Sequence, residues 1–312
     1  MMLEDVLKAP DTRRRGVKTE SYQAYNEDLS DVGKVAGVVS GHAQKTAIVC
    51  SGGGVRSAYA IGALHALAEV HGITQPAIGV ASSGGAAPLL YYLCGLFDHM
   101  HKWPDQCAER AFYTPLRFWR PLDIDYLVDH IYKDSVPDLP ERLTHTSCDF
   151  FIAATEYETG TRGWFTRDDI PHIYEALRAT KAVVGMYGKT VNVQGTEYVD
   201  GSFSADTNAL IEKAYAESAE RVIVIDNSAG LPRDIPYAQH TLRLYSHILP
   251  QQAGVLMRRF ADRTETALPT EYAPLIISRK ETLAVRHVFD TNRARMHQAV
   301  QEGWEDTSAL TL

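Results

Sequence analysis

The chain has 312 residues, of which 45% are hydrophobic and 22% are charged, and its formal net charge at pH 7 is −8. Such a composition is that of an ordinary globular protein with a substantial core, either one large α/β domain or one domain with appendages. The excess of acidic residues, with the basic ones scattered along the chain, argues against a nucleic-acid-binding protein. The four cysteines show no CxxC spacing, so reduced thiols in a cytosolic protein are expected.

The sequence shows neither the signal peptide of a secreted protein nor an apolar stretch long enough to span a membrane. The first five residues include two acids and lack the basic and apolar regions of a signal peptide. The longest apolar stretch, residues 86–96, is too short to span a bilayer and contains Pro88, so it predicts a buried helix. We therefore expect a cytoplasmic protein whose contact with membranes, if it has any, is peripheral.

Residues 1–43 lack a steady hydrophobic period and are interpreted as an N-terminal extension, partly helical around residues 22–29. From Thr46 onward, strand and helix patterns alternate. Strands are predicted at residues 46–50, 77–81, 149–155, 190–193, 197–199 and 221–226, and helices at residues 58–70, 86–96, 170–179, 209–218, 241–265 and 281–303. Because the strands are continuously apolar, the pattern predicts an α/β fold with a mostly parallel central sheet and helices on both faces.

The same pattern divides the chain into parts. Residues 44–268 are predicted to form the α/β domain. Residues 98–147, rich in aromatics, histidine and proline, form a helical insertion within it. Residues 269–312 are predicted to be a C-terminal helical segment packed on the domain, with residues 269–274 as a hinge.

Three glycines, Gly52, Gly53 and Gly54, follow the first strand directly. Backbone N–H groups at such a turn hold a phosphate or stabilise the negative charge that develops on a carbonyl oxygen. A nucleotide P-loop requires Gly-Lys-Ser/Thr after its glycines, whereas this chain has Val55-Arg56-Ser57. A dinucleotide site requires an acid at the end of the next strand, which ends here in Ala81-Ser82-Ser83. An oxyanion hole is therefore favoured, with a tight turn of no further function as the alternative.

The second strand ends in Ala81-Ser82-Ser83-Gly84-Gly85, which has the form of a nucleophile elbow. Small residues around the serine allow the strained strand-to-helix turn that exposes its hydroxyl. Serines are also common helix N-caps, and this is the plainer interpretation of the motif alone. Ser83 is preferred as the nucleophile because small residues flank it throughout; Ser82 is the alternative.

A serine nucleophile requires a base, and Asp200 is the candidate. It follows the strand at residues 197–199 and precedes Gly201, so its carboxylate projects from a strand end. By itself Asp-Gly indicates no more than a turn. None of the twelve histidines stands in a comparable motif: His65 lies within a predicted helix, and His240 and His247 lie in a late segment without turn signals.

The order of these motifs resembles the patatin-like phospholipase family: Gly-Gly-Gly-x-Arg, then small-x-Ser-x-Gly, then Asp-Gly. Further stretches similar to bacterial members are residues 83–86 running to Tyr92-Leu93, residues 114–118, residues 155–160 and residues 177–180. Residues from 274 onward are similar to a short C-terminal segment of one bacterial subgroup. The resemblance covers roughly residues 46–305.

This resemblance implies a three-layer α/β/α fold and a Ser-Asp dyad without histidine. It makes Ser83 the nucleophile, Asp200 the base and the Gly52–Gly54 amides the oxyanion hole, with no metal or cofactor. Three positions depart from the family pattern, since Ser57 and Ala81 replace glycines and Ser202 replaces a glycine or alanine. All three residues are small, so the turns remain feasible.

The expected function is that of a lipid acyl hydrolase, similar to a phospholipase A or lysophospholipase, acting on a lipid or ester substrate. Two alternatives remain open. One is a soluble esterase or thioesterase with the same dyad. The other is a weakly active scaffold of this fold that binds proteins.

Overall fold

An eight-stranded mixed sheet forms the centre of the computed structural model, which describes residues 44–312 except 110–111, 115–116, 118–119, 229–235 and 280–282. The expected N-terminal extension, residues 1–43, with its predicted helix, lies outside the described residues. The strand order is β5-β6-β3-β2-β1-β7-β8, and β4 pairs with β3 in addition. Their bounds are β1 Thr46–Cys50, β2 Ile78–Ser82, β3 Asp149–Glu156, β4 Arg162–Phe165, β5 Val191–Val193, β6 Thr196–Asp200, β7 Arg221–Ile225 and β8 Leu275–Ile277.

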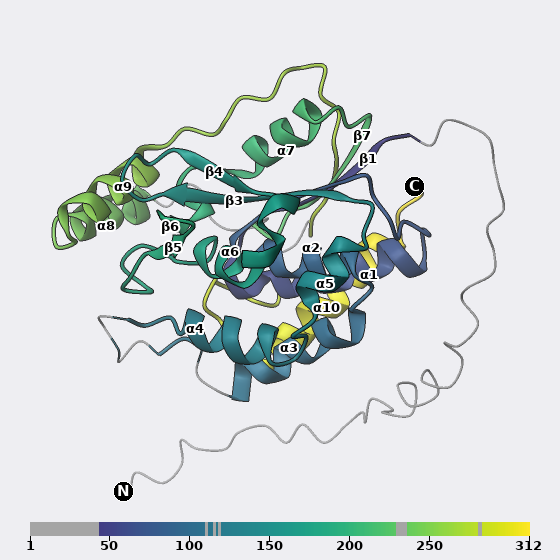
Figure 1. Cartoon of the computed structure of the whole chain (residues 1–312), viewed down its shortest axis with the longest axis horizontal. Coiled ribbons are helices and arrows are strands. Elements are labelled where there is room, and N and C mark those ends of the chain that lie inside the picture. The colour runs from purple at the N-terminus through teal and green to yellow at the C-terminus, as the bar shows by residue number, and fades with distance from the viewer. Residues whose placement is uncertain (1–43, 110–111, 115–116, 118–119, 229–235, 280–282) are drawn as a thin grey trace, which may run out of the picture. The chain divides into compact units, whose positions relative to one another are not determined.

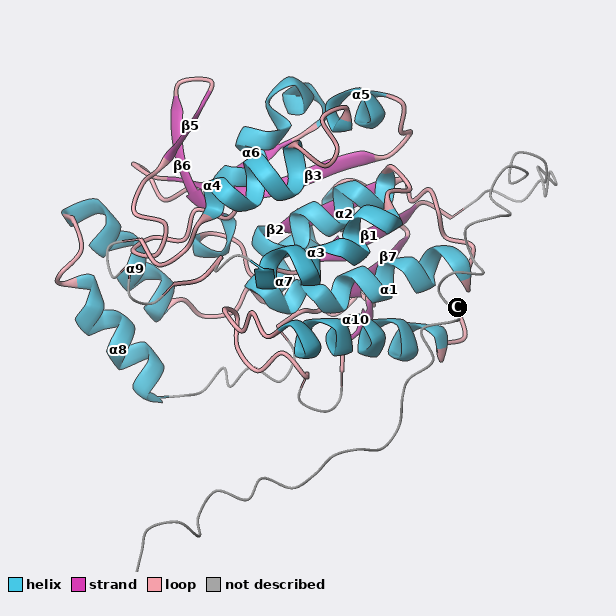
Figure 2. Cartoon of the chain, turned by 90° about the horizontal axis from the view of Figure 1, so that it is seen from below, coloured by secondary structure: helices cyan, strands magenta, loops and turns pink. Residues whose placement is uncertain are grey.

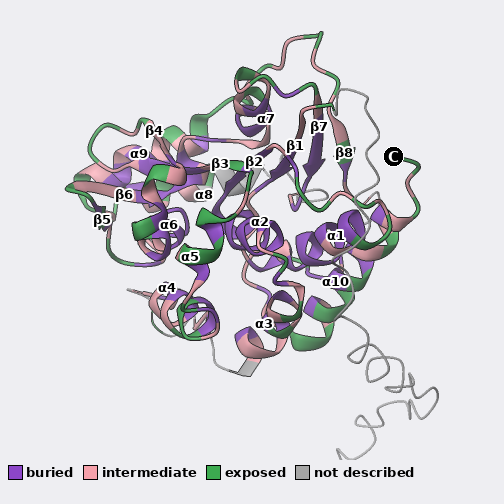
Figure 3. Ribbon diagram, turned by 45° about the vertical axis from the view of Figure 1, so that its right-hand side comes forward, coloured by how far each residue is buried: buried purple, intermediate pink, exposed green. Residues whose placement is uncertain are grey.

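The parallel part of the sheet is built on β1, which lies between β2 and β7. Its side chains alternate between two cores: Ala47 and Val49 face one, while Ile48 and Cys50 face the other. Both faces of a parallel strand must therefore be covered, and Figure 3 shows β1, β2 and β7 buried. The predicted mostly parallel sheet is confirmed.

Helices cover the two faces unequally. Helix α7 (Thr207–Ala216) packs on the face of Ala47 and Val49, above the sheet in Figure 1. The opposite face carries α1 (Ala58–Glu69), α2 (Ala86–Leu93), α3 (Phe97–Glu109) and α6 (Ile173–Ala179), with α10 (Arg293–Ser308) packed along α1. The predicted arrangement with helices on both faces is confirmed.

The edge of β3 explains how two distant strand ends meet. Strand β2 runs parallel along β3 and stops at the pair Ser82–Ala153, whereas β6 runs antiparallel and stops at the pair Asp200–Ala154. Because β4 pairs with residues 152–155 of β3 along one edge, β2 and β6 share the other edge. The two strands therefore point at each other and end opposite consecutive residues of β3.

Several short helical elements follow α2 in the connection between β2 and β3. Besides α3 the connection contains α4 (Ile124–Tyr126), a π-helix over Leu127–Lys133 and α5 (Leu139–Thr144). In Figure 1 these elements lie on the side of the sheet opposite α7.

The C-terminal part differs from its sequence-based prediction at three places. The helix expected at residues 241–265 is two helices, α8 (Pro236–Ser246) and α9 (Gln251–Asp262), because Pro250 lacks an N–H for the helix ladder and instead stands at the N-cap of α9. Residues 275–277 form the edge strand β8, so the segment after residue 269 is not purely helical. Helix α10 begins at Arg293, capped by the Asn292 side chain, and not at residue 281.

Helices α1 and α10 approach closely because each has a glycine at the crossing, and Figure 2 shows them side by side. A Cβ atom added to Gly62 would lie 1.8 Å from the Val300 carbonyl oxygen, and one added to Gly303 would lie 2.0 Å from that of Tyr59. The end of the chain is thus part of the main core.

Within the described part of the chain, no helix combines the length and apolar character that crossing a bilayer demands.

Candidate active site

Ser83 stands at the sharp turn between β2 and α2. Its φ is +47°, in the left-handed region that residues other than glycine seldom adopt. The turn is held from outside, because the Ser83 N–H donates to the Thr180 hydroxyl at 2.8 Å and that hydroxyl donates to the Ala153 carbonyl at 2.6 Å. A strained serine fixed by its surroundings is the geometry expected of a nucleophile elbow.

Ser83 and Asp200 are in direct contact. The Ser83 Oγ donates a hydrogen bond of 2.8 Å to the Asp200 Oδ2, and Asp200 Oδ1 accepts the Ser202 N–H at 2.8 Å. Asp200 is fully buried. The aspartate therefore pairs with Ser83, while Ser82, the alternative, is the last residue of β2 and lies beside Gly52.

Burial and polar contacts oppose each other at Asp200. Removal from water raises the pKa of this carboxyl group, whereas hydrogen bonds from Ser202 and Ser83 and the charge of Lys181 lower it. The net effect is a raised pKa. A carboxylate of raised pKa is a stronger base, which suits the removal of a proton from a serine hydroxyl.

The glycine loop lies against the elbow. A Cβ atom on Gly84 would come within 2.5 Å of the Gly54 carbonyl oxygen and 2.9 Å of its nitrogen, so only glycine fits there. Gly54 adopts φ +57°, and Gly53 packs against Asn227. In the described part of the chain, no carbonyl or side-chain oxygen accepts the N–H groups of Gly52, Gly53 or Gly54, which leaves these donors for a ligand.

Buried Arg56 anchors the loop from behind. Its guanidinium donates to the carbonyl oxygens of Asn227, at 2.9 Å, and Val285, at 3.1 Å. The N–H of Val55 donates to the Val288 carbonyl at 3.0 Å. The arginine of the Gly-Gly-Gly-x-Arg motif thus ties the glycine loop to the end of β7 and to the C-terminal segment.

A narrow cavity of about 80 Å³ opens from Ser83, Gly54 and Gly84. Its wall is mostly apolar and comes from four distant stretches of the chain: α1, the insertion, the residues that follow α6, and α10 with the segment leading into it. The principal wall residues are Ile61, Trp103, Leu127, Tyr132, Phe289 and Met296. A small cavity with a mostly apolar wall suits a hydrocarbon group better than a bulky polar one.

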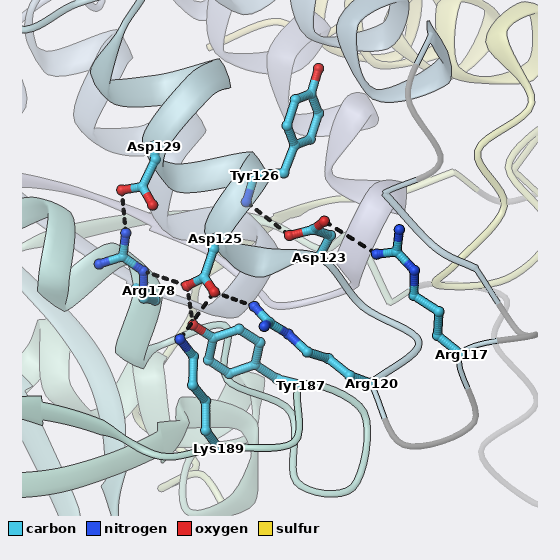
Figure 4. A network of polar contacts seen from close by, with 9 residues as sticks. All are labelled: Arg117, Arg120, Asp123, Asp125, Tyr126, Asp129, Arg178, Tyr187 and Lys189. Atoms are coloured by element: carbon cyan, nitrogen blue, oxygen red, sulfur yellow. Dashed lines mark hydrogen bonds and ion pairs between the residues drawn. The ribbon is translucent and has the colours of Figure 1, made fainter.

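A network of charges braces the insertion that forms part of this wall (Figure 4). Asp125 of α4 accepts bonds from Tyr187 and Arg120 and forms an ion pair of 3.0 Å with Lys189. Burial works to raise the pKa of Asp125, but the hydrogen bonds from these three side chains together lower it to about 2. Asp125 therefore stays ionised at neutral pH and joins α4 to the segment that follows α6.

The histidines that the structure describes take no part in this arrangement. His65 contacts His101 at 2.9 Å and stacks on Phe97, and His240 and His247 are exposed. Among the described residues no histidine lines the cavity or bonds to Ser83 or Asp200.

Two polar residues at the site were not predicted from the sequence. Thr180 supports the backbone of Ser83, and Lys181 donates from its Nζ to the Ser83 carbonyl oxygen at 2.8 Å. Both belong to a segment bonded to the turn after β6, since Asp200 N–H and Gly201 N–H donate to the carbonyls of Ala182 and Thr180. Thr180 stands in a stretch similar to the bacterial family members, but nothing in the local pattern distinguishes Lys181.

Fold and site together define an α/β protein with a strained serine paired to a buried aspartate beside a glycine loop. The model of the patatin-like phospholipase family matches residues 48–212, more than half of the chain, and the chain belongs to this family.

Two further comparisons give more distant similarities. The uncharacterized protein YjjU of Escherichia coli (strain K12) is 26% identical over 189 residues, which are 58% of this chain and 51% of that protein. The chain thus matches about half the length of this curated relative. The crystal structure of VipD from Legionella pneumophila aligns with 85% of this chain and 66% of its own, at 12% identity and a TM-score of 0.41.

Proposed function

We propose that this protein is a lipid acyl hydrolase that cleaves carboxylic esters through Ser83 and Asp200. The observation that carries the proposal is the 2.8 Å hydrogen bond from the hydroxyl of Ser83, a residue that lines an apolar cavity, to the buried carboxylate of Asp200. Membership of the patatin-like phospholipase family supports the lipid class of substrate. The proposed substrates are phospholipids or lysophospholipids, whose acyl chain enters the apolar cavity.

The reaction proceeds in two halves. The Ser83 Oγ attacks the ester carbonyl carbon while Asp200 takes the hydroxyl proton, and the resulting oxyanion is stabilised by N–H groups of the glycine loop. Collapse of this intermediate breaks the bond to the alcohol, which leaves with the proton from Asp200. A water molecule then attacks the acyl-enzyme while Asp200 accepts its proton. Collapse of this second intermediate breaks the bond to the Ser83 Oγ, which takes the proton back from Asp200, and the fatty acid is released.

The first experiment compares Ser83→Ala with Ser82→Ala. We expect Ser83→Ala to lower turnover of a medium-chain ester by roughly a thousand-fold or more and to abolish covalent labelling by a fluorophosphonate. Ser82→Ala, which removes a neighbouring hydroxyl not bonded to Asp200, is the matched control and should retain most of both. The reverse result would assign the nucleophile to Ser82.

A lipid panel separates the proposed function from its alternatives. Faster hydrolysis of micellar phospholipid than of monomeric short-chain ester supports the lipid acyl hydrolase. Preference for the monomeric ester points instead to a soluble esterase. Folded protein with neither turnover nor labelling contradicts an enzymatic role and leaves the scaffold alternative.

A further inference from the structure

A lysine is buried beside the elbow. Lys181, only 4% exposed, is the one charged side chain among the described residues that line the cavity. Its Nζ donates to the Ser83 carbonyl oxygen at 2.8 Å and lies 5.7 Å from the centre of the Tyr132 ring. The ammonium group therefore stands one backbone step from the proposed nucleophile.

This lysine is costly to bury. An ammonium group has three donors, yet within the described part of the chain Ser83 supplies its one hydrogen-bond acceptor and no carboxylate pairs with it. Burial of a charge without a partner is strongly unfavourable. A methionine of similar length would fill the same apolar space at lower cost, so the position of the lysine calls for a role in the site.

The bond to Ser83 fixes the direction of a neighbouring donor. In a trans peptide the C=O and N–H point in opposite directions, so holding the Ser83 carbonyl also orients the Gly84 N–H. The Ser83 oxygen accepts from Lys181 Nζ and from the Ala86 N–H at the start of α2. Ser83 and Gly84 both line the cavity, where the oriented N–H is available to a developing oxyanion.

The charge of Lys181 also acts on Asp200. Three ionisable groups from three other elements face the lysine or share its cavity wall: Asp200 of β6, Tyr132 of the π-helix and Cys107 of α3. Burial raises the pKa of Tyr132, and it raises that of Cys107 to about 12, so both are neutral near pH 7. Asp200 is thus the one anion of this set that the ammonium group stabilises.

We propose that Lys181 is a positioning residue of the proposed hydrolysis: its ammonium group orients the Ser83–Gly84 peptide for the oxyanion and keeps Asp200 in the carboxylate form. This inference rests on the function proposed above. It predicts that the lysine affects kcat and the pH dependence of the reaction, not the binding of the acyl chain.

The test is the pH profile of kcat/KM for the wild type, Lys181→Met and Lys181→Arg. Burial lowers the pKa of Lys181 from 10.5 to about 7, with the charge of Asp200 opposing this shift. As the pH rises, kcat/KM of the wild type should therefore increase when Asp200 loses its proton. It should decrease in part at higher pH, when Lys181 loses its proton. Lys181→Met should lower kcat about 10- to 100-fold with little change in KM. Its acid limb should lie at higher pH, because Asp200 has lost a favourable charge, and its alkaline step should disappear.

Lys181→Arg separates charge from packing, since arginine keeps its proton throughout this range. It should retain the acid limb of the wild type and lack the alkaline step. Lys213→Met, which removes a partly buried lysine of α7 on the opposite face of the sheet, is the matched control and should reproduce the wild-type profile. Thermal melting of each variant establishes that it is folded.

If Lys181→Met proves unfolded, the temperature dependence of the wild-type pH profile still tests the inference. Ionisation of an amine has a large enthalpy, so an alkaline limb due to lysine moves to lower pH on warming; a limb that stays in place overturns the inference. A folded Lys181→Met with a wild-type profile also overturns it, while the proposed function stands if Ser83→Ala is inactive. Activity that survives Ser83→Ala contradicts the proposed function itself.

Discussion

Three residues of the site each cost the folded state free energy. Ser83 adopts a left-handed backbone conformation, Asp200 is a fully buried carboxylate, and Lys181 is a buried amine that forms no ion pair with a carboxylate among the described residues. Strain and buried charge of this kind persist where the surrounding structure holds them in place. Here the supports are specific: Thr180 holds the Ser83 N–H, and Ser202 binds the second oxygen of Asp200.

Asp200→Asn tests this cost directly. The asparagine keeps the shape: its oxygen accepts the Ser202 N–H and its amide donates to Ser83, but it has no basicity, so turnover should be lost. The pKa of Asp200 is raised on folding, so the carboxylate lowers stability at pH values above its folded pKa and has no effect below its unfolded pKa. The variant should therefore be more stable than the wild type at neutral pH, with a difference that vanishes in acid.

Urea denaturation of both proteins at several pH values measures this difference. The Ser83→Ala variant, which leaves the carboxylate in place, is the control and should show no comparable gain. Lower stability of Asp200→Asn at neutral pH would show that the ionised form stabilises the fold, contrary to the raised pKa.

Among the elements, β3 brings the site together. Strands β2 and β6 end opposite Ala153 and Ala154, so their exits deliver Ser83 and Asp200 to the same point. The glycine loop after β1 reaches this point only because glycines allow backbone to touch backbone, with Gly84 against Gly54 and Gly85 against the Ser51 carbonyl. The positions of the residues are therefore set by strand lengths and register.

Gly84→Ala should separate the glycine loop from the elbow. The added methyl group would lie 2.5 Å from the Gly54 carbonyl oxygen, which is backbone and cannot rotate away. The loop amides would move from the oxyanion position, and we expect kcat to fall roughly 100-fold or more.

Gly79→Ala in the middle of β2 is the matched control. Its methyl group would meet a Leu89 side-chain carbon at 3.1 Å, and that side chain can adjust. Steady-state kinetics and thermal melting of both variants test the argument. Equal turnover of Gly84→Ala and Gly79→Ala would remove the glycine loop from the proposed mechanism.

The local pattern predicted which candidate site residues stand at strand ends. The glycine run, the small residues around Ser83 and the Asp-Gly dipeptide each follow an apolar strand, and the parallel strands β1 and β2 bring their exits together. Strand β6 reaches the same point from the opposite direction, antiparallel along β3, and this long-range pairing is not visible in the local pattern. Lys181 was not predicted because its role depends on burial and on a carbonyl 98 residues away. Strand β8 was missed because three residues after Pro274 give too short a run to show an alternating pattern.

At the scale of the whole molecule, the cavity is assembled from segments far apart in the chain. Trp103 and Tyr132 come from the insertion, whereas Val288, Phe289 and Met296 come from the last 25 residues. Apolar residues in such segments look like ordinary core residues in the sequence, so the cavity wall could not be predicted. The packing of α10 on α1 therefore positions residues of the cavity wall as well as residues of the core.

Gly303→Ala tests this coupling between the end of the chain and the cavity. In an unconstrained helix, alanine would be more favourable than glycine by about 1 kcal/mol. Here the added methyl group would lie 2.0 Å from the Tyr59 carbonyl oxygen and 3.0 Å from the Ala63 nitrogen, so α10 must move away from α1. We expect the free energy of unfolding to fall by about 1–3 kcal/mol, as in other overpacked cores. Because Met296 of α10 lines the cavity, KM for a medium-chain ester should rise, whereas Ser83 should still react with a fluorophosphonate.

Gln301→Ala, on the exposed side of the same helix, is the control and should leave the free energy of unfolding and KM near their wild-type values. Urea denaturation and steady-state kinetics measure the two effects, and a Gly303→Ala variant as stable as Gln301→Ala would contradict the close packing of α10 on α1.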